Sequence, residues 1–308
     1  MSSTLPIRVV YIAGYGRSGT TLLDIVLGQH PDVVGAGEIA ELTGHVWHEN
    51  EYCACGQPVH DCDFWSPLLR QWLDAHPSSL MRRYEDCQEK IESLAGLSKL
   101  YSGYGRGEEF AFYSRATTRL FEAIRSRSGK STIVDSSKNP GRAMALALIP
   151  EIDLRVIHVV RDGRGVAWSL AKPYARDVKS GLQRTIKPRP IFRTALRWSI
   201  VNLGAECLSN KLGPQKFMRL RYEDFVSNPA STMERIGSFA GLDLAAIGES
   251  LQRGEAIRPG HQIAGNRLRM NTSISLSADE KWRTMMPPAQ QTLFRFLGGA
   301  MLRRYGYR

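Results

Sequence analysis

The chain has 308 residues, of which 43% are hydrophobic and 23% charged, and its formal net charge is +11. This composition is that of a soluble globular protein, and the basic balance suits an anionic ligand or merely a solvated basic surface. No stretch approaches the ~18 consecutive apolar residues of a membrane span, and no signal peptide is visible. With an odd count of five cysteines, we expect a cytoplasmic protein without a transmembrane segment.

The first predicted unit, residues 7–23 (IRVVYIAGYGRSGTTLL), combines a strand, a glycine-rich turn and the start of a helix. Its almost continuous apolar run, 7–13, is typical of a buried strand in a parallel sheet. Three glycines follow, and an apolar segment opens a helix at Thr20. Glycines let backbone N–H groups approach a phosphate, and a helix N-terminus adds free donors and partial positive charge. The unit therefore predicts an anion-binding site.

The spacing is close to a nucleotide-binding P-loop, G-x4-G-K-[ST], with one departure. Gly14 and Gly19 fit, but Thr20 stands in place of the lysine, and the fixed cation of the turn is Arg17. This departure argues against an ordinary ATPase or kinase, because no lysine reaches the β/γ-phosphates. A tight turn that only closes a βα unit is the structural alternative. The hydroxyl groups of the turn belong to Ser18, Thr20 and Thr21.

Residues 33–42 (VVGAGEIAEL) place Glu38 on a second loop, after two glycines. A lone glutamate on a loop is often solvated surface. Glycines also allow close backbone approach, so a functional role for Glu38 and a surface role are equally favoured.

Residues 45–65 (HVWHENEYCACGQPVHDCDFW) form an irregular segment rich in cysteine and histidine. Its C-x-C followed by x6-C is not a standard C-x2-C…C-x2-C zinc framework. We expect a disulfide or a buried cluster of cysteine and tryptophan rather than a metal, and assign no metal ligand. Residues 65–101 and 109–126 are predicted to be helical. The residues that a metal site in 45–65 would use are Cys53, Cys55, Cys62, His45, His48 and His60.

The segment STIVDSSKNPGRA predicts a second βα unit, with a strand at 132–134, a turn at 135–138 and a helix at 143–149. The carboxyl ends of parallel strands lie at one edge of a sheet. We therefore expect Lys138 on the same edge as the glycine-rich turn.

The segment LRVIHVVRDGRGVAWSLAK predicts a third βα unit, with a strand at 154–160. Arg161 ends the strand and Ser169 lies inside the following helix, so both can reach one phosphate. Arg164 is a second cation in the turn. A structural salt bridge is the alternative role of either arginine.

The rest of the chain contains one more strand and several helices. Residues 173–190 are basic and bounded by proline. This pattern favours a mobile loop that gates the site or contacts an acceptor, and it equally favours a charged surface exposed to solvent. The predicted elements that follow are a helix at 191–212, a strand at 217–225, a helix after Asn228-Pro229, a loop at 260–271 and an amphipathic helix from Pro287.

Taken together, these motifs resemble sulfotransferases that use 3′-phosphoadenosine 5′-phosphosulfate (PAPS), in the branch shared by bacterial, carbohydrate and tyrosylprotein enzymes. GYGRSGTTLL resembles the 5′-phosphosulfate loop, RVIHVVRDGRGVAWS the 3′-phosphate motif and RYEDFVSNP a later strand-and-turn segment. CACGQPVHDCDFW and GHQIAGNRLR resemble segments of one bacterial branch. The resemblance covers about residues 8–285. It implies a single α/β domain over 1–308, with a three-layer P-loop-like fold, a central parallel sheet flanked by helices, and a cysteine-containing insertion at about 45–110.

The resemblance also implies site roles. Glu38 would be the general base, and Arg17 and Lys138 would stabilise the transferring sulfuryl group. PAPS would be the donor, 3′,5′-bisphosphoadenosine (PAP) the product, and the acceptor a hydroxyl of a glycan, lipid, small molecule or protein, with no metal required. The basic surface favours an acidic or glycan acceptor. The implied nucleotide ligands are Arg17, Ser18, Gly19, Thr20, Thr21, Arg161, Ser169, Tyr222, Gly265, Asn266 and Arg267.

Two other classes compete. A P-loop-type small-molecule kinase would need an aspartate to hold magnesium, and Asp135 is the candidate. A basic nucleic-acid-binding protein would explain the net charge, but we find no zinc finger or RNA-recognition motif and few aromatics in 173–190, so we expect no nucleic-acid partner.

Overall fold

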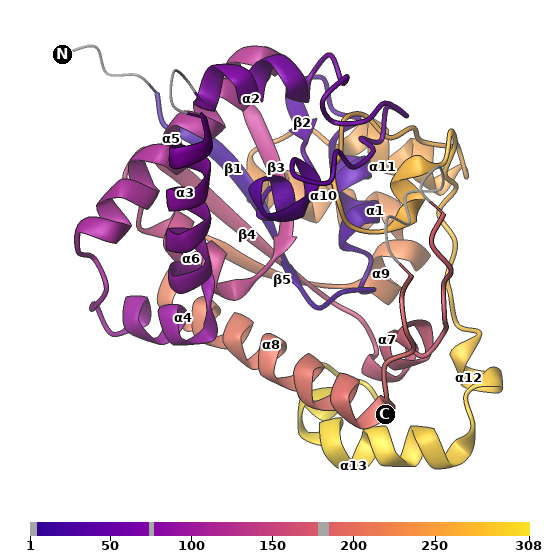
Figure 1. Ribbon diagram of the computed structural model, residues 1–308. Coiled ribbons are helices and arrows are strands. Elements are labelled where there is room, and N and C mark those ends of the chain that lie inside the picture. The colour runs from indigo at the N-terminus through magenta and orange to yellow at the C-terminus, as the bar shows by residue number, and fades with distance from the viewer. Residues whose placement is uncertain (1–4, 74–76, 178–184) are drawn as a thin grey trace.

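The computed structural model describes residues 5–73, 77–177 and 185–308, and its centre is a parallel sheet of five strands (Figure 1). The strand order is β2-β3-β1-β4-β5, and every neighbouring pair is parallel. The carboxyl ends of all five strands therefore lie at one edge. The strands are β1 (Ile7–Gly14), β2 (Val33–Gly35), β3 (Thr132–Lys138), β4 (Ile152–Val160) and β5 (Phe217–Arg221).

The central strand, β1, separates two cores because its side chains alternate between the two faces of the sheet. Val9 and Tyr11 belong to one buried cluster, and Val10 and Ile12 belong to another. Since both faces are covered, the strand reads as a continuous apolar run.

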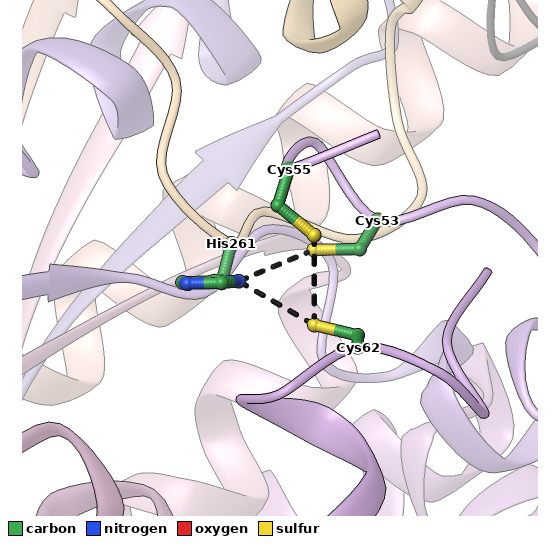
Figure 2. Close-up of side chains that lie close together, drawn as sticks. All are labelled: Cys53, Cys55, Cys62 and His261. Carbon is green, nitrogen blue, oxygen red and sulfur yellow. Dashed lines mark hydrogen bonds between the residues drawn. The ribbon is translucent and has the colours of Figure 1, made fainter. Parts of the chain in front are cut away.

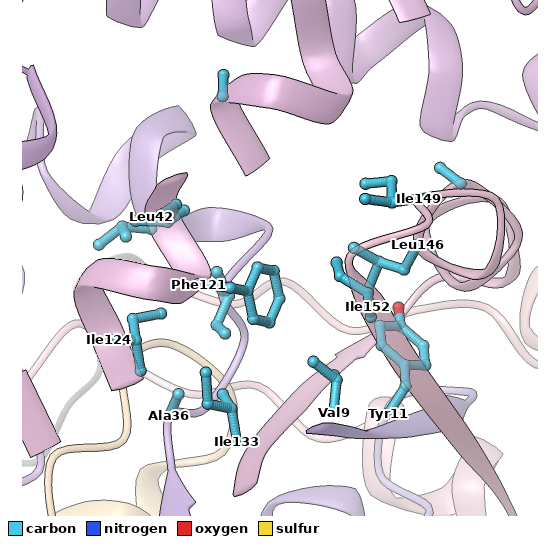
Figure 3. Packing of buried hydrophobic residues seen from close by; sticks show 14 of the residues in the cluster. Val9, Tyr11, Ala36, Leu42, Phe121, Ile124, Ile133, Leu146, Ile149 and Ile152 are labelled. Carbon is cyan, nitrogen blue, oxygen red and sulfur yellow. The ribbon is translucent and has the colours of Figure 1, made fainter. Parts of the chain in front are cut away.

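The first face is covered by the larger set of helices (Figure 1). Figure 3 shows Phe121 and Ile124 of this layer near Val9 and Ile133 of the sheet. The helices are α2 (Trp65–Leu73), α3 (Pro77–Glu92), α4 (Leu94–Tyr101), α5 (Glu108–Ser128), α6 (Pro140–Ala147) and the C-terminal half of α8 (Ile191–Leu212).

The opposite face and the far end of the sheet carry the remaining helices. The opposite face is covered by α1 (Thr20–Leu27), α9 (Tyr222–Ser227), α10 (Pro229–Ala240) and α11 (Ala245–Gln252). A third cluster lies beyond β4, around Trp198 of α8 and Phe294, and joins α7 (Gly163–Leu170), α12 (Trp282–Met285) and α13 (Pro288–Arg304). Sheet and helices thus form three layers, and the expected α/β class is confirmed.

Several elements differ from the sequence-based expectations, and helix α6 begins at Pro140 and ends at Ala147 instead of covering 143–149. Strand β3 runs to Lys138, so residues 135–138 are strand rather than turn, because the buried Asp135 is satisfied inside the core and Ser136 N–H donates to the Gly37 carbonyl at 2.8 Å. Strand β5 ends at Arg221, and the residues after it begin α9. The three-residue strand β2 was expected to be loop.

Within the described ranges, no helix has both the length and the apolar composition that crossing a membrane requires.

Candidate active site

A pocket of about 610 Å³ opens at the carboxyl edge of the sheet. It lies where β1, β3, β4 and β5 end, and residues far apart in the sequence meet there. Twelve of the thirteen site residues expected from sequence line this pocket; Ser18 is the exception. The lining members of that set are Arg17, Gly19, Thr20, Thr21, Glu38, Lys138, Arg161, Ser169, Tyr222, Gly265, Asn266 and Arg267.

The turn after β1 needs its last glycine. Gly19 caps α1 with φ of 92°, in the left-handed region, and a Cβ on it would lie 2.5 Å from the Tyr222 ring. The close approach of Tyr222 therefore excludes any side chain at Gly19. The Ser18 hydroxyl is buried beside this turn and has no hydrogen-bond partner among the described residues.

Arg17 is held over the pocket in an unusual backbone conformation. Its φ is 70°, and burial lowers the pKa of its guanidinium. The guanidinium lies 5.6 Å from the centroid of the Tyr174 ring, and that of Arg267 lies 5.0 Å from the same ring. Two cations thus share one aromatic side chain at the pocket.

Glu38 and Lys138 meet across the pocket floor as a largely buried ion pair. Lys138 also has φ of 70°, at the end of β3. The Glu38 N–H donates to the Ile263 carbonyl at 3.0 Å, which fixes the glutamate loop against the chain before Gly265. Gly265 has φ of 79°, which glycine adopts without strain, and a Cβ on it would lie 2.5 Å from the Glu38 carboxylate and displace it.

Arg161 is buried at the end of β4 and lies 4.7 Å from the centroid of the Tyr222 ring. One Nη donates to the Arg17 carbonyl at 3.1 Å, and the other donates to the carbonyl and carboxylate of Asp279 at 2.7 and 3.1 Å. Ser169 lies on α7 and lines the same pocket. The carboxylate of Asp279 therefore occupies a hydrogen-bonding position that an incoming anion can take.

Arg164, the other arginine of this turn, is structural. It pairs with Asp162 at 2.6 Å, donates to the Arg308 carbonyl at 2.6 Å and lies 4.7 Å from the Trp282 ring centroid. The salt-bridge alternative raised from the sequence holds for this residue.

Asp135, the candidate magnesium ligand of a kinase, is fully buried and does not line the pocket. Arg142 donates to it from Nε at 2.8 Å and to Glu92 from Nη1 at 2.6 Å, and Ser137 N–H donates to it at 3.0 Å. Both carboxylate oxygens of Asp135 therefore accept hydrogen bonds within the core and do not face the pocket, which argues against the kinase alternative.

Sequence reasoning missed Asp24 of α1, which contacts the loop that carries Glu38. Its carboxylate accepts a hydrogen bond from the Gly37 N–H at 3.0 Å. Burial raises the pKa of Asp24 to about 7. The available signal was a single acidic residue within the apolar helix TTLLDIVL.

A second missed feature is an acidic wall of the pocket. His45 forms ion pairs with Glu41 and Glu51, both at 2.8 Å, and all three residues line the pocket. Hydrogen bonds to Glu41 and Glu51 raise the pKa of His45 to about 9. His45 is therefore an ion-pair partner and not part of a cysteine cluster.

All five cysteines are described and free, so of the two alternatives raised from the sequence the disulfide is wrong. The expected buried cluster is present, since Cys53 and Cys62 share a core with Trp65. The histidine near these cysteines is His261 rather than His48 or His60. His48 pairs with Glu85 at 2.7 Å, and His60 contacts the Trp47 carbonyl at 2.8 Å.

The basic segment 173–190 contacts the pocket through its described ends. The backbones of Tyr174 and Ile186 exchange hydrogen bonds of 3.1 and 2.8 Å, and Ile186 lines the pocket. Residues 178–184 lie outside the described ranges, so its expected gating role stays a prediction.

Comparisons with known proteins agree on one family. A family model described as "Sulfotransferase family" matches residues 9–246. Nodulation protein NoeE of Sinorhizobium fredii (strain NBRC 101917 / NGR234) is 24% identical over 323 residues, which cover 99% of this chain and 67% of NoeE. Carbohydrate sulfotransferase 5 of Mus musculus is 28% identical over 170 residues, which cover 52% of this chain and only 43% of the mouse protein.

A solved structure shares the fold. The sulfotransferase domain from the curacin biosynthetic pathway superposes with a TM-score of 0.53 at 16% identity, covering 99% of both chains. The family model covers well over half of the sequence, and the chain therefore belongs to the sulfotransferase family and is an enzyme of that family.

Proposed function

We propose that the protein transfers the sulfuryl group of PAPS to an acceptor hydroxyl. The observation that carries this proposal is the convergence of Arg17, Lys138 and Arg161 with a glycine-rich turn, a helix N-terminus and Glu38 around one pocket. A bisphosphorylated nucleotide carries anionic groups at both ends of its ribose, and the cations are distributed to match. The 5′-phosphosulfate would bind at residues 17–21, and the 3′-phosphate at Arg161 and Ser169.

The reaction is an in-line displacement at sulfur. The acceptor oxygen forms the new S–O bond, the bond to the bridging phosphate oxygen breaks, and PAP leaves with the added negative charge. Arg17, Lys138 and the turn N–H groups would stabilise this charge. Fixed cations thus supply neutralisation that a metal supplies in many phosphoryl transferases.

The proton of the acceptor hydroxyl goes to Glu38 as general base. In the described structure Glu38 is paired with Lys138. An incoming phosphosulfate would compete for the lysine and leave the carboxylate available to the acceptor. The ion pair is therefore the resting form of the two groups.

The acceptor is proposed only as a class. NoeE and the carbohydrate sulfotransferase are relatives by sequence, and the acidic wall of Glu41, Glu51 and His45 offers acceptors and donors for a polar hydroxyl compound. A glycan or another polyhydroxyl acceptor fits this wall. We further propose that residues 45–110 form an insertion within one sulfotransferase domain, and that the protein is cytoplasmic.

The decisive experiment is calorimetric titration of the protein with PAP, in a buffer without added metal. Wild-type protein should bind in the micromolar range, and Arg161→Ala should weaken binding at least about tenfold, because a charge-assisted hydrogen bond contributes about 1.5–3 kcal/mol. The matched control is Arg235→Ala, which removes an exposed arginine from α10 outside the pocket. Binding of ATP with magnesium and not of PAP would contradict the proposal and favour the kinase alternative.

A further inference from the structure

The cysteine cluster lies outside the pocket and has no role in the proposed reaction. Cys53, Cys55 and Cys62 come from one short segment before α2, and His261 comes from the loop after α11. Their three Sγ atoms and one imidazole nitrogen all lie within 4.8 Å of one another (Figure 2). Four potential metal ligands thus converge from two distant parts of the chain.

The separations match a tetrahedral centre. With Zn–S of about 2.3 Å and Zn–N of about 2.0–2.1 Å, tetrahedral angles place ligand sulfurs about 3.8 Å apart and sulfur and nitrogen about 3.6 Å apart. Cys55 Sγ lies 3.7 Å from Cys62 Sγ, and His261 Nδ1 lies 3.7 Å from Cys53 Sγ and 3.4 Å from Cys62 Sγ. A disulfide would need about 2.05 Å between sulfurs.

The backbone holds the cysteine segment in a tight turn. The Cys53 N–H donates to the Gln57 carbonyl and the Gly56 N–H donates to the Cys53 carbonyl, both at 2.9 Å. Gly56 has φ of 88°, which glycine adopts without strain. The ligands are therefore positioned by local structure and not only by side-chain rotation.

Two aromatic neighbours hold the histidine, one at its ring and one at its backbone. Phe64 stacks on His261 with ring centroids 5.1 Å apart and planes 19° apart, and Trp65 Nε1 donates to the His261 carbonyl at 2.7 Å. Cys53 and Cys62 are buried and Cys55 is exposed, which gives the site a path to solvent. Partners outside the ligand set that fix the ligands are typical of built metal sites.

We propose that Cys53, Cys55, Cys62 and His261 bind one zinc ion in a closed Cys3His site. Three sulfurs and one imidazole favour zinc over the oxygen-preferring cations, and four protein ligands leave no open position for catalysis. Binding converts the three thiols to thiolates and releases their protons to solvent. No oxidation or reduction is involved, so the ion acts as a structural cross-link.

The cross-link has a direct route to the pocket. His261 precedes Gln262 and Ile263, whose backbones pair with Ala54 N–H at 3.0 Å and Glu38 N–H at 3.0 Å. Two residues later, Gly265 abuts the Glu38 carboxylate. Zinc therefore links the cysteine segment to the loop that borders the pocket. Through this link, zinc binding should favour nucleotide binding, an expectation that rests on the function proposed above.

The test begins with metal content. Protein purified without a polyhistidine tag and without chelator should contain one zinc per chain by plasma mass spectrometry. Cys55→Ala and His261→Ala should each lose most of it, whereas Cys207→Ala, which removes an exposed free cysteine on α8, should retain it. Full zinc in both ligand variants would overturn the proposal.

A second measurement does not depend on the variants folding. Wild-type protein stripped by chelator and titrated with Co²⁺ should develop the intense visible absorption of a tetrahedral cobalt–thiolate centre, saturating at one equivalent, and Zn²⁺ should displace it. A weak octahedral cobalt spectrum, or a Cys55–Cys62 disulfide in freshly purified zinc-free protein, would overturn the site. If neither the zinc-bound nor the zinc-free protein binds PAP, that result counts against the proposed function and does not bear on the zinc site.

Discussion

Lys138 Nζ donates to the Glu38 carboxylate, although the two residues are 100 positions apart in the chain. The contact joins the carboxyl end of β3 to the loop after β2, at the floor of the pocket. The candidate base and the candidate electrostatic stabiliser thus form an ion pair with each other in this structure.

Removing either partner should reduce turnover, for different reasons. Lys138→Ala should lower kcat about 10²–10³-fold, as loss of one stabilising donor does. Glu38→Gln should lower kcat about 10²–10⁴-fold through loss of the base, while PAP affinity falls little or rises because the lysine is released. Steady-state kinetics and calorimetry separate the two effects. The control Lys216→Ala lies on the surface outside the pocket; near-normal turnover in both pocket variants would contradict the assigned roles.

Asp279 should act as a competitor of the nucleotide at Arg161. Its carboxylate accepts from Arg161 at 3.1 Å and is half exposed. Asp279→Asn should therefore tighten PAP binding several-fold, a gain of up to about 1 kcal/mol because the carboxylate of the pair is half exposed. Calorimetry measures the change, and weaker binding in this variant would show that Asp279 orients Arg161 instead.

Gly265→Ala should disturb the ion pair through its Cβ, which would lie 2.5 Å from Glu38 Oε1. The matched control is Gly129→Ala. Both glycines have positive φ (79° and 66°), but Gly129 faces open space at the C-terminal end of α5. Each variant should lose about 1–2 kcal/mol of unfolding free energy from the left-handed backbone, measured by chemical denaturation. Only Gly265→Ala should also lower kcat/KM, by at least about tenfold; equal kinetics in both would contradict the contact.

His45 should make stability depend on pH above neutrality. Its pKa is raised to about 9 by Glu41 and Glu51, so its stabilisation is complete below the unfolded value of about 6.5 and is lost as pH rises through 9. Because the side chain is 32% exposed, solvent screening limits the effect to roughly 1–2 kcal/mol. His45→Gln should flatten the dependence of the denaturation midpoint on pH over this range.

Asp24 should act in the opposite range of pH. Burial raises the pKa of Asp24 to about 7, so the neutral acid is favoured by folding, and the free energy of unfolding falls as pH rises from about 4 to about 7. Asp24→Asn keeps an acceptor for the Gly37 N–H and should remove about 2–4 kcal/mol of this fall. Exposed Asp32→Asn serves as control. An unchanged pH dependence in Asp24→Asn would show that Asp24 is not the titrating group.

Several elements were readable from sequence because their signals are local. The strand–turn–helix order around Gly19, the helix at 191–212 and the position of Lys138 at a strand end follow from apolar runs, glycines and helix periodicity. Strand β2 was missed because three residues are too short to show periodicity. The turn expected at 135–138 was wrong. Arg142 forms a buried polar network with Asp135 and Glu92, and no local sequence pattern predicts this network.

The phosphate-binding units and their order can be read from the amino-acid sequence, because parallel strands bring every carboxyl end to one edge and so place Arg17, Lys138 and Arg161 together. The partners of the polar side chains follow only from the folded chain: Lys138 pairs with Glu38, Arg142 pairs with Asp135, and His261 meets three cysteines about 200 positions earlier. The two kinds of information differ in the distance along the chain over which they act. Backbone geometry and periodicity act over a few residues, whereas charge pairing and ligand clustering depend on distances that chain folding alone sets.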